Sequence, residues 1–172
     1  MLTVVDDELV VEEKGIYSIE KFILARRLMY WQVYLHKTVL AADFMLSNIL
    51  RRSKYLGEQG SDLFATPALN RFLQNPVKGK EMLCREDCLE TFSQLDDFDI
   101  FSAMKVWSTH PDPILSLLCK HLVDRHLFRA ELRNQPFDPA YVATIRESAA
   151  NSFGIKPEDT GYLVTEDSTA CY

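Results

Sequence analysis

Apolar residues recur at helical spacing along most of this chain, and turn signals divide the pattern into separate elements. Residues 18–55 contain neither proline nor glycine, and their apolar positions follow a period of about 3.6 residues. This pattern predicts one very long helix over residues 17–55, with room for a single break.

Two short β-branched runs lie at the start of the chain. Residues 3–5 and 9–11 flank the acidic turn Asp6-Asp7-Glu8, and Gly15 follows them. Val-rich runs around such a turn are typical of paired strands. We therefore expect a small hairpin within residues 1–14.

Residues 61–154 carry several helix starts. Thr66-Pro67, Asp112-Pro113 and Asp138-Pro139 each place an N-cap residue before a proline at the first helical position. Asp96-Asp97 offers acidic caps to a helix that runs to about Trp107. The segment is therefore predicted to be a helical region.

The last apolar run, Tyr162-Leu163-Val164-Thr165, predicts a strand followed by a polar tail over residues 160–172. A lone strand must pair, either with the N-terminal hairpin or with sequence outside this chain. The predicted fold class is mostly α (α+β): one multi-helix, bundle-like domain over residues 1–172, with a small N-terminal hairpin and a C-terminal strand.

Composition narrows the possible functions. The chain has 172 residues, of which 47% are hydrophobic, and a formal net charge of −6. A chain of this length can bury one hydrophobic core. Its negative net charge disfavours nucleic acid as a partner. Charges interrupt every apolar run before the ~18 residues of a membrane span. The four cysteines, which lack zinc-site spacing, are expected to be free thiols in a reducing cytoplasm: Cys84, Cys88, Cys119 and Cys171.

Two cations and two phenols interrupt the apolar face of the predicted long helix. At about 100° per residue, Arg26, Tyr30, Tyr34 and Lys37 fall within roughly 80° of one another. They share this face with four apolar residues: Ile19, Phe22, Ile23 and Val33. An Arg fork and a Lys ammonium could clamp a polyphosphate, and the tyrosines could pack on a sugar.

A structural alternative fits the same spacing. Arg26 and Lys37 could pair with Asp or Glu of neighbouring helices, while the tyrosines form ordinary core with polar tips. The other arginines of the helix, Arg27, Arg51 and Arg52, face elsewhere and are predicted to be solvated.

The run EKFILARRLMYWQVYLHKT, residues 20–38, resembles a helix of HD-domain proteins, in the dNTP triphosphohydrolase branch. In that family an R-x-x-[MLH]-x-x-x-x-Y-x-H-K-like helix follows the catalytic core and lines the nucleotide pocket. Residues 95–100, 105–107 and 125–129 resemble later helices of the family, so the similarity covers about residues 15–133.

The resemblance implies roles for five residues. Arg26 would reach a triphosphate oxygen, Tyr34 would pack near the deoxyribose, and Tyr30 stands where a histidine often lies close to the scissile phosphate. His36 and Lys37 match positions that approach an activating nucleotide at a subunit boundary in regulated members. The chain would then belong to a homo-oligomer that binds dNTP.

The family's reaction is metal-assisted attack of water on phosphorus, with His and Asp ligands. None of the four histidines of this chain is followed by Asp: His36, His110, His121 and His126. We therefore expect no catalytic residue and no metal site here. The chain would be a fragment, inactive alone, of a protein whose missing N-terminal HD portion holds the divalent metal.

A second function class remains open. The chain could be a helical protein–protein interaction or oligomerisation module with no nucleotide role, its long-helix face buried against a partner or a second copy.

Overall fold

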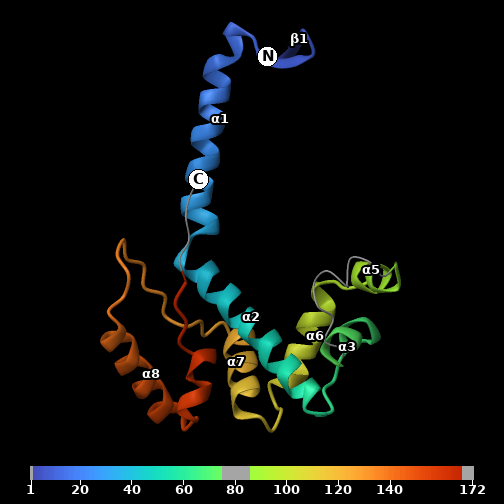
Figure 1. The fold of residues 1–172 in the computed structure, drawn as a ribbon, viewed down its shortest axis with the longest axis vertical. Helices are drawn as coiled ribbons and strands as arrows, with labels where there is room; N and C mark the ends of the chain where they lie inside the picture. Colours follow the sequence, from blue (N-terminus) through green and yellow to red (C-terminus); the bar gives the residue numbers. More distant parts are fainter. Residues whose placement is uncertain (1, 75–85, 168–172) are drawn as a thin grey trace. The chain divides into compact units, whose positions relative to one another are not determined.

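The computed structural model describes residues 2–74 and 86–167 (Figure 1). The chain divides into two compact units, Met1–Leu40 and Ala41–Tyr172. The predictions for Cys84 and Cys171, and for the tail beyond residue 167, lie outside the described residues.

The first unit begins with the predicted hairpin. Strands β1 (Leu2–Val5) and β2 (Glu8–Val11) pair antiparallel, with Val5 opposite Glu8. Asp6 and Asp7 between them have φ values of 51° and 66°. Both turn residues therefore adopt the left-handed conformation that a two-residue type I′ turn requires and that Asp tolerates.

The predicted long helix is present in three pieces. After the 3-10 turn η1 (Glu13–Gly15), helix α1 covers Ile16–Met29, and a π-helical turn, η2, covers Tyr30–Tyr34. Helix α2 (Lys37–Glu58) follows a break at Leu35, where φ is −96° and ψ is 14°. The Leu35 N–H donates to the Tyr30 carbonyl five residues back, at 2.8 Å.

The second unit contains α3 (Pro67–Gln74), α5 (Glu86–Ser93), α6 (Asp97–Trp107), α7 (Pro113–Val123), α8 (Pro139–Phe153) and the 3-10 helix η3 (Pro157–Tyr162). The predicted caps are confirmed. Asp96 forms a capping box with Asp99, and Asp112 and Asp138 accept from the N–H groups of Leu115 and Ala140.

The core of this unit forms around Trp107. Its ring is buried among α2, α6 and α7 side chains, including Ile49, Leu115 and Leu118. The indole N–H donates to the Phe64 carbonyl at 3.0 Å, so the polar atom of this large ring is satisfied inside the core.

The C-terminal strand prediction is wrong for residues 162–165. η3 ends at Tyr162, and the N–H groups of Leu163 and Val164 both donate to the Thr160 carbonyl at 2.9 Å. These local turn bonds use backbone groups that a strand would need for a partner. The mostly helical class is confirmed, with one two-stranded hairpin among the described residues. In the described ranges, no helix combines the length and hydropathy needed to cross a membrane.

Candidate functional site

Arg26, Tyr30 and Tyr34 lie in a row along the end of α1 and the π-helical turn. The Arg26 guanidinium donates to the Tyr30 hydroxyl at 3.2 Å and lies 5.1 Å from the centre of its ring. The ring centres of Tyr30 and Tyr34 are 5.0 Å apart, with the planes inclined at 49°. Spacing of four residues brings these side chains together on one helix surface. The structure thus groups the three predicted substrate-binding residues.

This row is open to solvent. Arg26 is exposed, and Tyr30 and Tyr34 are 39% and 52% exposed. Arg26, Phe22, Ala25 and Met29 line an open hollow of about 200 Å³. Within residues 2–74 and 86–167, neither Arg26 nor Lys37 forms an ion pair, so the expected alternative of neutralisation by carboxylates is not found there.

His36 and Lys37 lie at the break between η2 and α2. Both are exposed, and the His36 Nδ1 accepts a hydrogen bond from the Thr38 N–H at 3.3 Å. The prediction that Lys37 lies on the same face as Arg26 assumed a constant rotation of about 100° per residue. The π-helical turn and the break at Leu35 interrupt that rotation. Helical spacing therefore places Arg26, Tyr30 and Tyr34 together but does not place Lys37 beside them.

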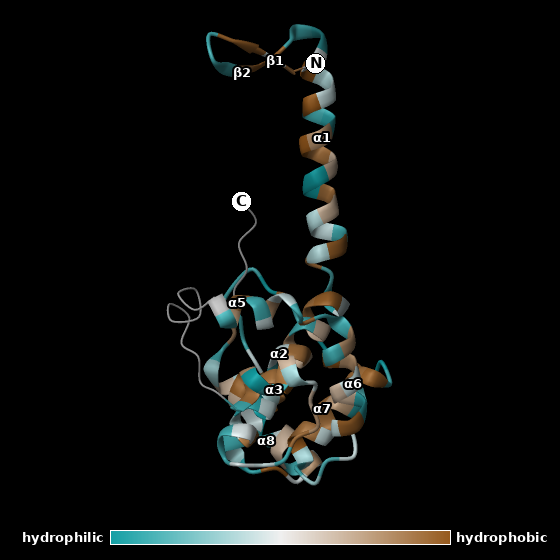
Figure 2. Ribbon diagram, turned by 90° about the vertical axis from the view of Figure 1, so that its right-hand side faces the viewer, coloured by the Kyte–Doolittle hydropathy of each residue, from teal (hydrophilic) through white to brown (hydrophobic). Residues whose placement is uncertain are grey.

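The apolar residues beside Arg26 are exposed as well. No residue of α1 is buried, and Phe22, Ile23, Trp31 and Val33 each leave more than half of their surface open. Figure 2 shows brown, apolar segments on α1 and on the hairpin. An apolar surface of this extent marks an interaction site more often than a simple solvent face.

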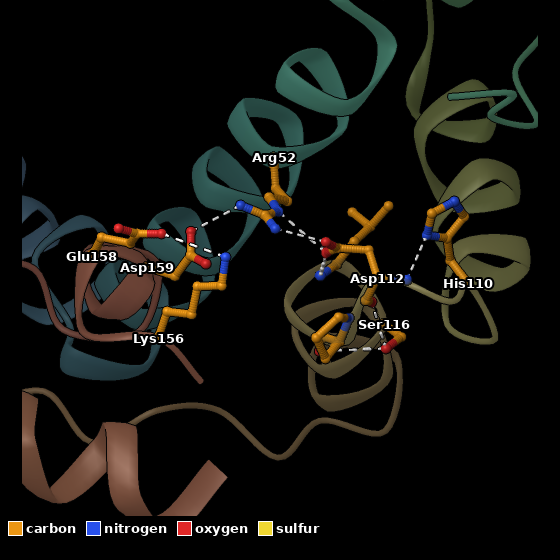
Figure 3. Close-up of polar contacts among 9 residues, drawn as sticks. Arg52, His110, Asp112, Ser116, Lys156, Glu158 and Asp159 are labelled. Carbon is orange, nitrogen blue, oxygen red and sulfur yellow. Dashed lines mark hydrogen bonds and ion pairs between the residues drawn. The ribbon is translucent and has the colours of Figure 1, made fainter. Parts of the chain in front are cut away.

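A second polar cluster surrounds Arg52, in the other unit (Figure 3). Arg52 of α2 donates from Nη2 and Nε to the two carboxylate oxygens of Asp112, at 2.6 and 3.2 Å, and from Nη1 to Asp159 at 3.0 Å. The Arg52 and Asp112 side chains are only 11% and 10% exposed. The prediction that Arg52 is solvated is therefore wrong, because it shares the inward face of α2 with Asn48 and Ile49, three to four residues back.

The electrostatics of this cluster are internally balanced. Burial opposes ionisation of Arg52, but the hydrogen bonds and charges of Asp112 and the other partners outweigh it and raise the pKa of Arg52. Burial likewise opposes ionisation of Asp112, yet the bonds from Arg52 and the Leu115 N–H hold the pKa of Asp112 below its usual value. The guanidinium carbon of Arg52, Cζ, also lies 5.2 Å from the centre of the Tyr162 ring. Because every charge is already paired, the cluster serves to hold α2, α7 and η3 together.

The described residues do not form a metal centre. No group of three or more His, Cys, Asp or Glu side chains among them could hold an ion. His110 Nδ1 accepts from the Asp112 N–H at 3.0 Å, and His121 packs edge-on against Phe128 and Phe153. Cys88 and Cys119 are buried free thiols.

Comparison with known proteins relates this chain to larger ones. Residues 1–63 match the family model of the HD associated region. The uncharacterized protein YwfO of Bacillus subtilis is 32% identical over 124 residues, which span 72% of this chain and 27% of YwfO. The crystal structure of a phosphohydrolase from Bacteroides thetaiotaomicron is 48% identical and matches with a TM-score of 0.91, covering 94% of this chain and 41% of that one. The chain thus spans less than half of either relative, and the matches support a relation to HD-associated phosphohydrolases.

Proposed function

We propose that this chain is the C-terminal helical part of a metal-dependent HD-superfamily phosphohydrolase that acts on nucleotides. It contributes a phosphate- and sugar-binding helix and subunit contacts rather than the metal site. The observation that carries the proposal is the Arg26–Tyr30–Tyr34 row, which is exposed and lies within the region matched by the HD associated family.

The row has the chemistry that a deoxynucleoside triphosphate requires. The Arg26 guanidinium has further N–H donors beyond the one that binds Tyr30, and a guanidinium fork suits phosphate oxygens. Tyr30 fixes the orientation of Arg26, and the half-exposed ring of Tyr34 offers a flat surface for the sugar. With a net charge of −6 on the chain, phosphate binding depends on such a local cation.

Hydrolysis itself is assigned elsewhere in the longer protein. Among the described residues, no group of three or more His, Cys, Asp or Glu side chains could hold a divalent metal. Arg26 binds and orients the phosphates, while the HD portion is proposed to hold the ion and its activated water. His36 and Lys37, exposed at the helix break, are proposed to approach a regulatory nucleotide or a neighbouring subunit.

The test uses the proposed longer protein, in which an HD domain would precede this chain. Release of phosphate or triphosphate from dNTP is measured with a divalent metal. Arg26→Ala removes a charged hydrogen bond worth about 1.5–3 kcal/mol, so kcat/KM should fall roughly 10- to 100-fold. The matched control is Arg27→Ala, an exposed neighbour outside the row, which should stay within about twofold. Equal losses of kcat/KM in both variants would refute the phosphate-binding role of Arg26. Residues 1–172 alone should release neither phosphate nor triphosphate.

A helical interaction module is the second candidate, favoured by the exposed apolar residues of α1. The two hypotheses predict different melting temperatures for the proposed longer protein in the presence of dNTP. A bound nucleotide stabilises by RT ln(1 + [L]/Kd), about 2.7 kcal/mol at a hundredfold excess over Kd. An unchanged melting temperature at millimolar dNTP would support the interaction module.

A further inference from the structure

The outer face of α6 carries large apolar side chains that no described residue covers. Phe98 and Phe101 are 79% and 54% exposed, whereas Ala103, Met104 and Trp107 of the same helix are buried in the core. Exposed apolar patches rimmed by polar residues often mark sites of protein–protein interaction. α6 therefore presents a second packing face outside the unit's own core.

The charges on this face are arranged symmetrically about Phe101. Asp97 lies four residues before it and Lys105 four residues after it, so all three residues run along one side of the helix. Both charged side chains are exposed, and in the part of the chain that the structure describes neither forms an ion pair. The face thus has an apolar middle, a negative end and a positive end.

We infer that this α6 face is a contact between two copies of the protein, related by a twofold axis passing near Phe101. In that antiparallel arrangement Asp97 meets the partner's Lys105, and Lys105 meets the partner's Asp97. Phe98 and Phe101 of both copies meet between the two ion pairs. A self-complementary pattern is what a twofold contact requires, and it favours a second copy over an unrelated partner.

The area available is consistent with a dimer that recruits neighbouring surface. A phenylalanine has about 150–250 Å² of surface, so covering the exposed parts of Phe98 and Phe101 in two copies removes about 500 Å² from water. Specific interfaces bury roughly 1,000 Å² or more. The remainder must come from adjoining side chains, beginning with Val106 of α6, which is 47% exposed.

Charge exchange tests the inference on the intact chain by sedimentation velocity and light scattering. Lys105→Asp and Asp97→Lys each replace two attractions by two repulsions and should weaken association at least about tenfold. The double variant D97K/K105D should recover it, because the exchanged charges attract again across the axis. Lys120→Asp, a reversal at an exposed position on α7, is the matched control and should change nothing.

Phe101→Asp provides a second test that does not depend on rescue. It places two like charges at the axis and should abolish the contact, while circular dichroism shows an unchanged fold. The inference is overturned if the wild-type chain is monomeric, if the single reversals keep the wild-type mass, or if the double variant stays dissociated. None of these outcomes involves Arg26 or nucleotide, so the proposed role in nucleotide binding stands or fails separately.

Discussion

Replacing Arg52 with methionine removes the charge that joins α2, α7 and η3 but keeps most of the alkyl packing. The change leaves Asp112 and Asp159, 10% and 21% exposed, without their shared counter-charge. We expect a large loss in the free energy of unfolding of the second unit. Burial removes water from the two carboxylates, and without Arg52 no counter-charge offsets that loss of hydration.

The magnitude lies between two limits. Removing one partner of a fully buried ion pair costs about 3–5 kcal/mol, and an exposed pair contributes at most about 1 kcal/mol. Asp112 retains its hydrogen bond from the Leu115 N–H, and Asp159 is partly hydrated. We therefore expect Arg52→Met to cost about 2–4 kcal/mol at neutral pH. Arg51→Met is the control. Arg51 is exposed, and among the described residues it donates only to Asn48, at 3.1 Å, and lies over the Tyr162 ring, so its replacement should cost less than about 1 kcal/mol.

The sign of the pH dependence follows from Asp112. Its pKa is lowered in the folded state, so its contribution to stability is present above the unfolded pKa of about 3.9 and is lost as pH falls through the folded value. The difference between wild type and Arg52→Met should therefore be greatest near neutral pH and shrink below about pH 4.

Urea unfolding followed by tryptophan fluorescence measures this difference. Trp31 lies in the first unit and Trp107 in the core of the second, so a Trp31→Phe background isolates the relevant transition. A stabilising role of Arg52 is refuted if Arg52→Met is as stable as Arg51→Met at pH 7, or if the difference between them is the same at pH 7 and pH 2.5.

Two further substitutions test the packing and the backbone of the second unit. Trp107→Phe removes the indole donor to the Phe64 carbonyl and should cost about 0.5–1.5 kcal/mol for this hydrogen bond plus a cavity contribution, measured by urea unfolding. Gly154→Ala forces a Cβ onto a residue with φ of 62° and should cost about 1–2 kcal/mol in a thermal scan, although no atom lies within 4 Å of the new Cβ. Gly161→Ala, equally uncrowded but without positive φ, should show no such loss.

Features encoded by neighbouring residues could be predicted from the sequence. The caps at Asp96, Asp112 and Asp138 and the hairpin turn depend on bonds within three residues, and all were found where the pattern placed them. The Arg26–Tyr30–Tyr34 row depends on helical spacing alone and was also found.

Features that depend on distant residues could not be predicted. The partners of Arg52 lie 60 and 107 residues away, so no local pattern distinguished it from the exposed Arg51. The apolar run at 162–165 has strand character, but strand formation requires a partner, and local turn bonds to Thr160 formed instead. The π-helical turn at residues 30–34 likewise altered the helix phase that placed Lys37 beside Arg26.

Nucleotide binding by the proposed longer protein, measured by titration calorimetry, tests most directly whether Arg26 binds phosphate. Arg26→Ala should weaken binding of a deoxynucleoside triphosphate roughly 10- to 100-fold and leave binding of the matching deoxynucleoside unchanged, because only the former has phosphates for the guanidinium. Equal affinity of wild type and Arg26→Ala for the triphosphate would contradict the account.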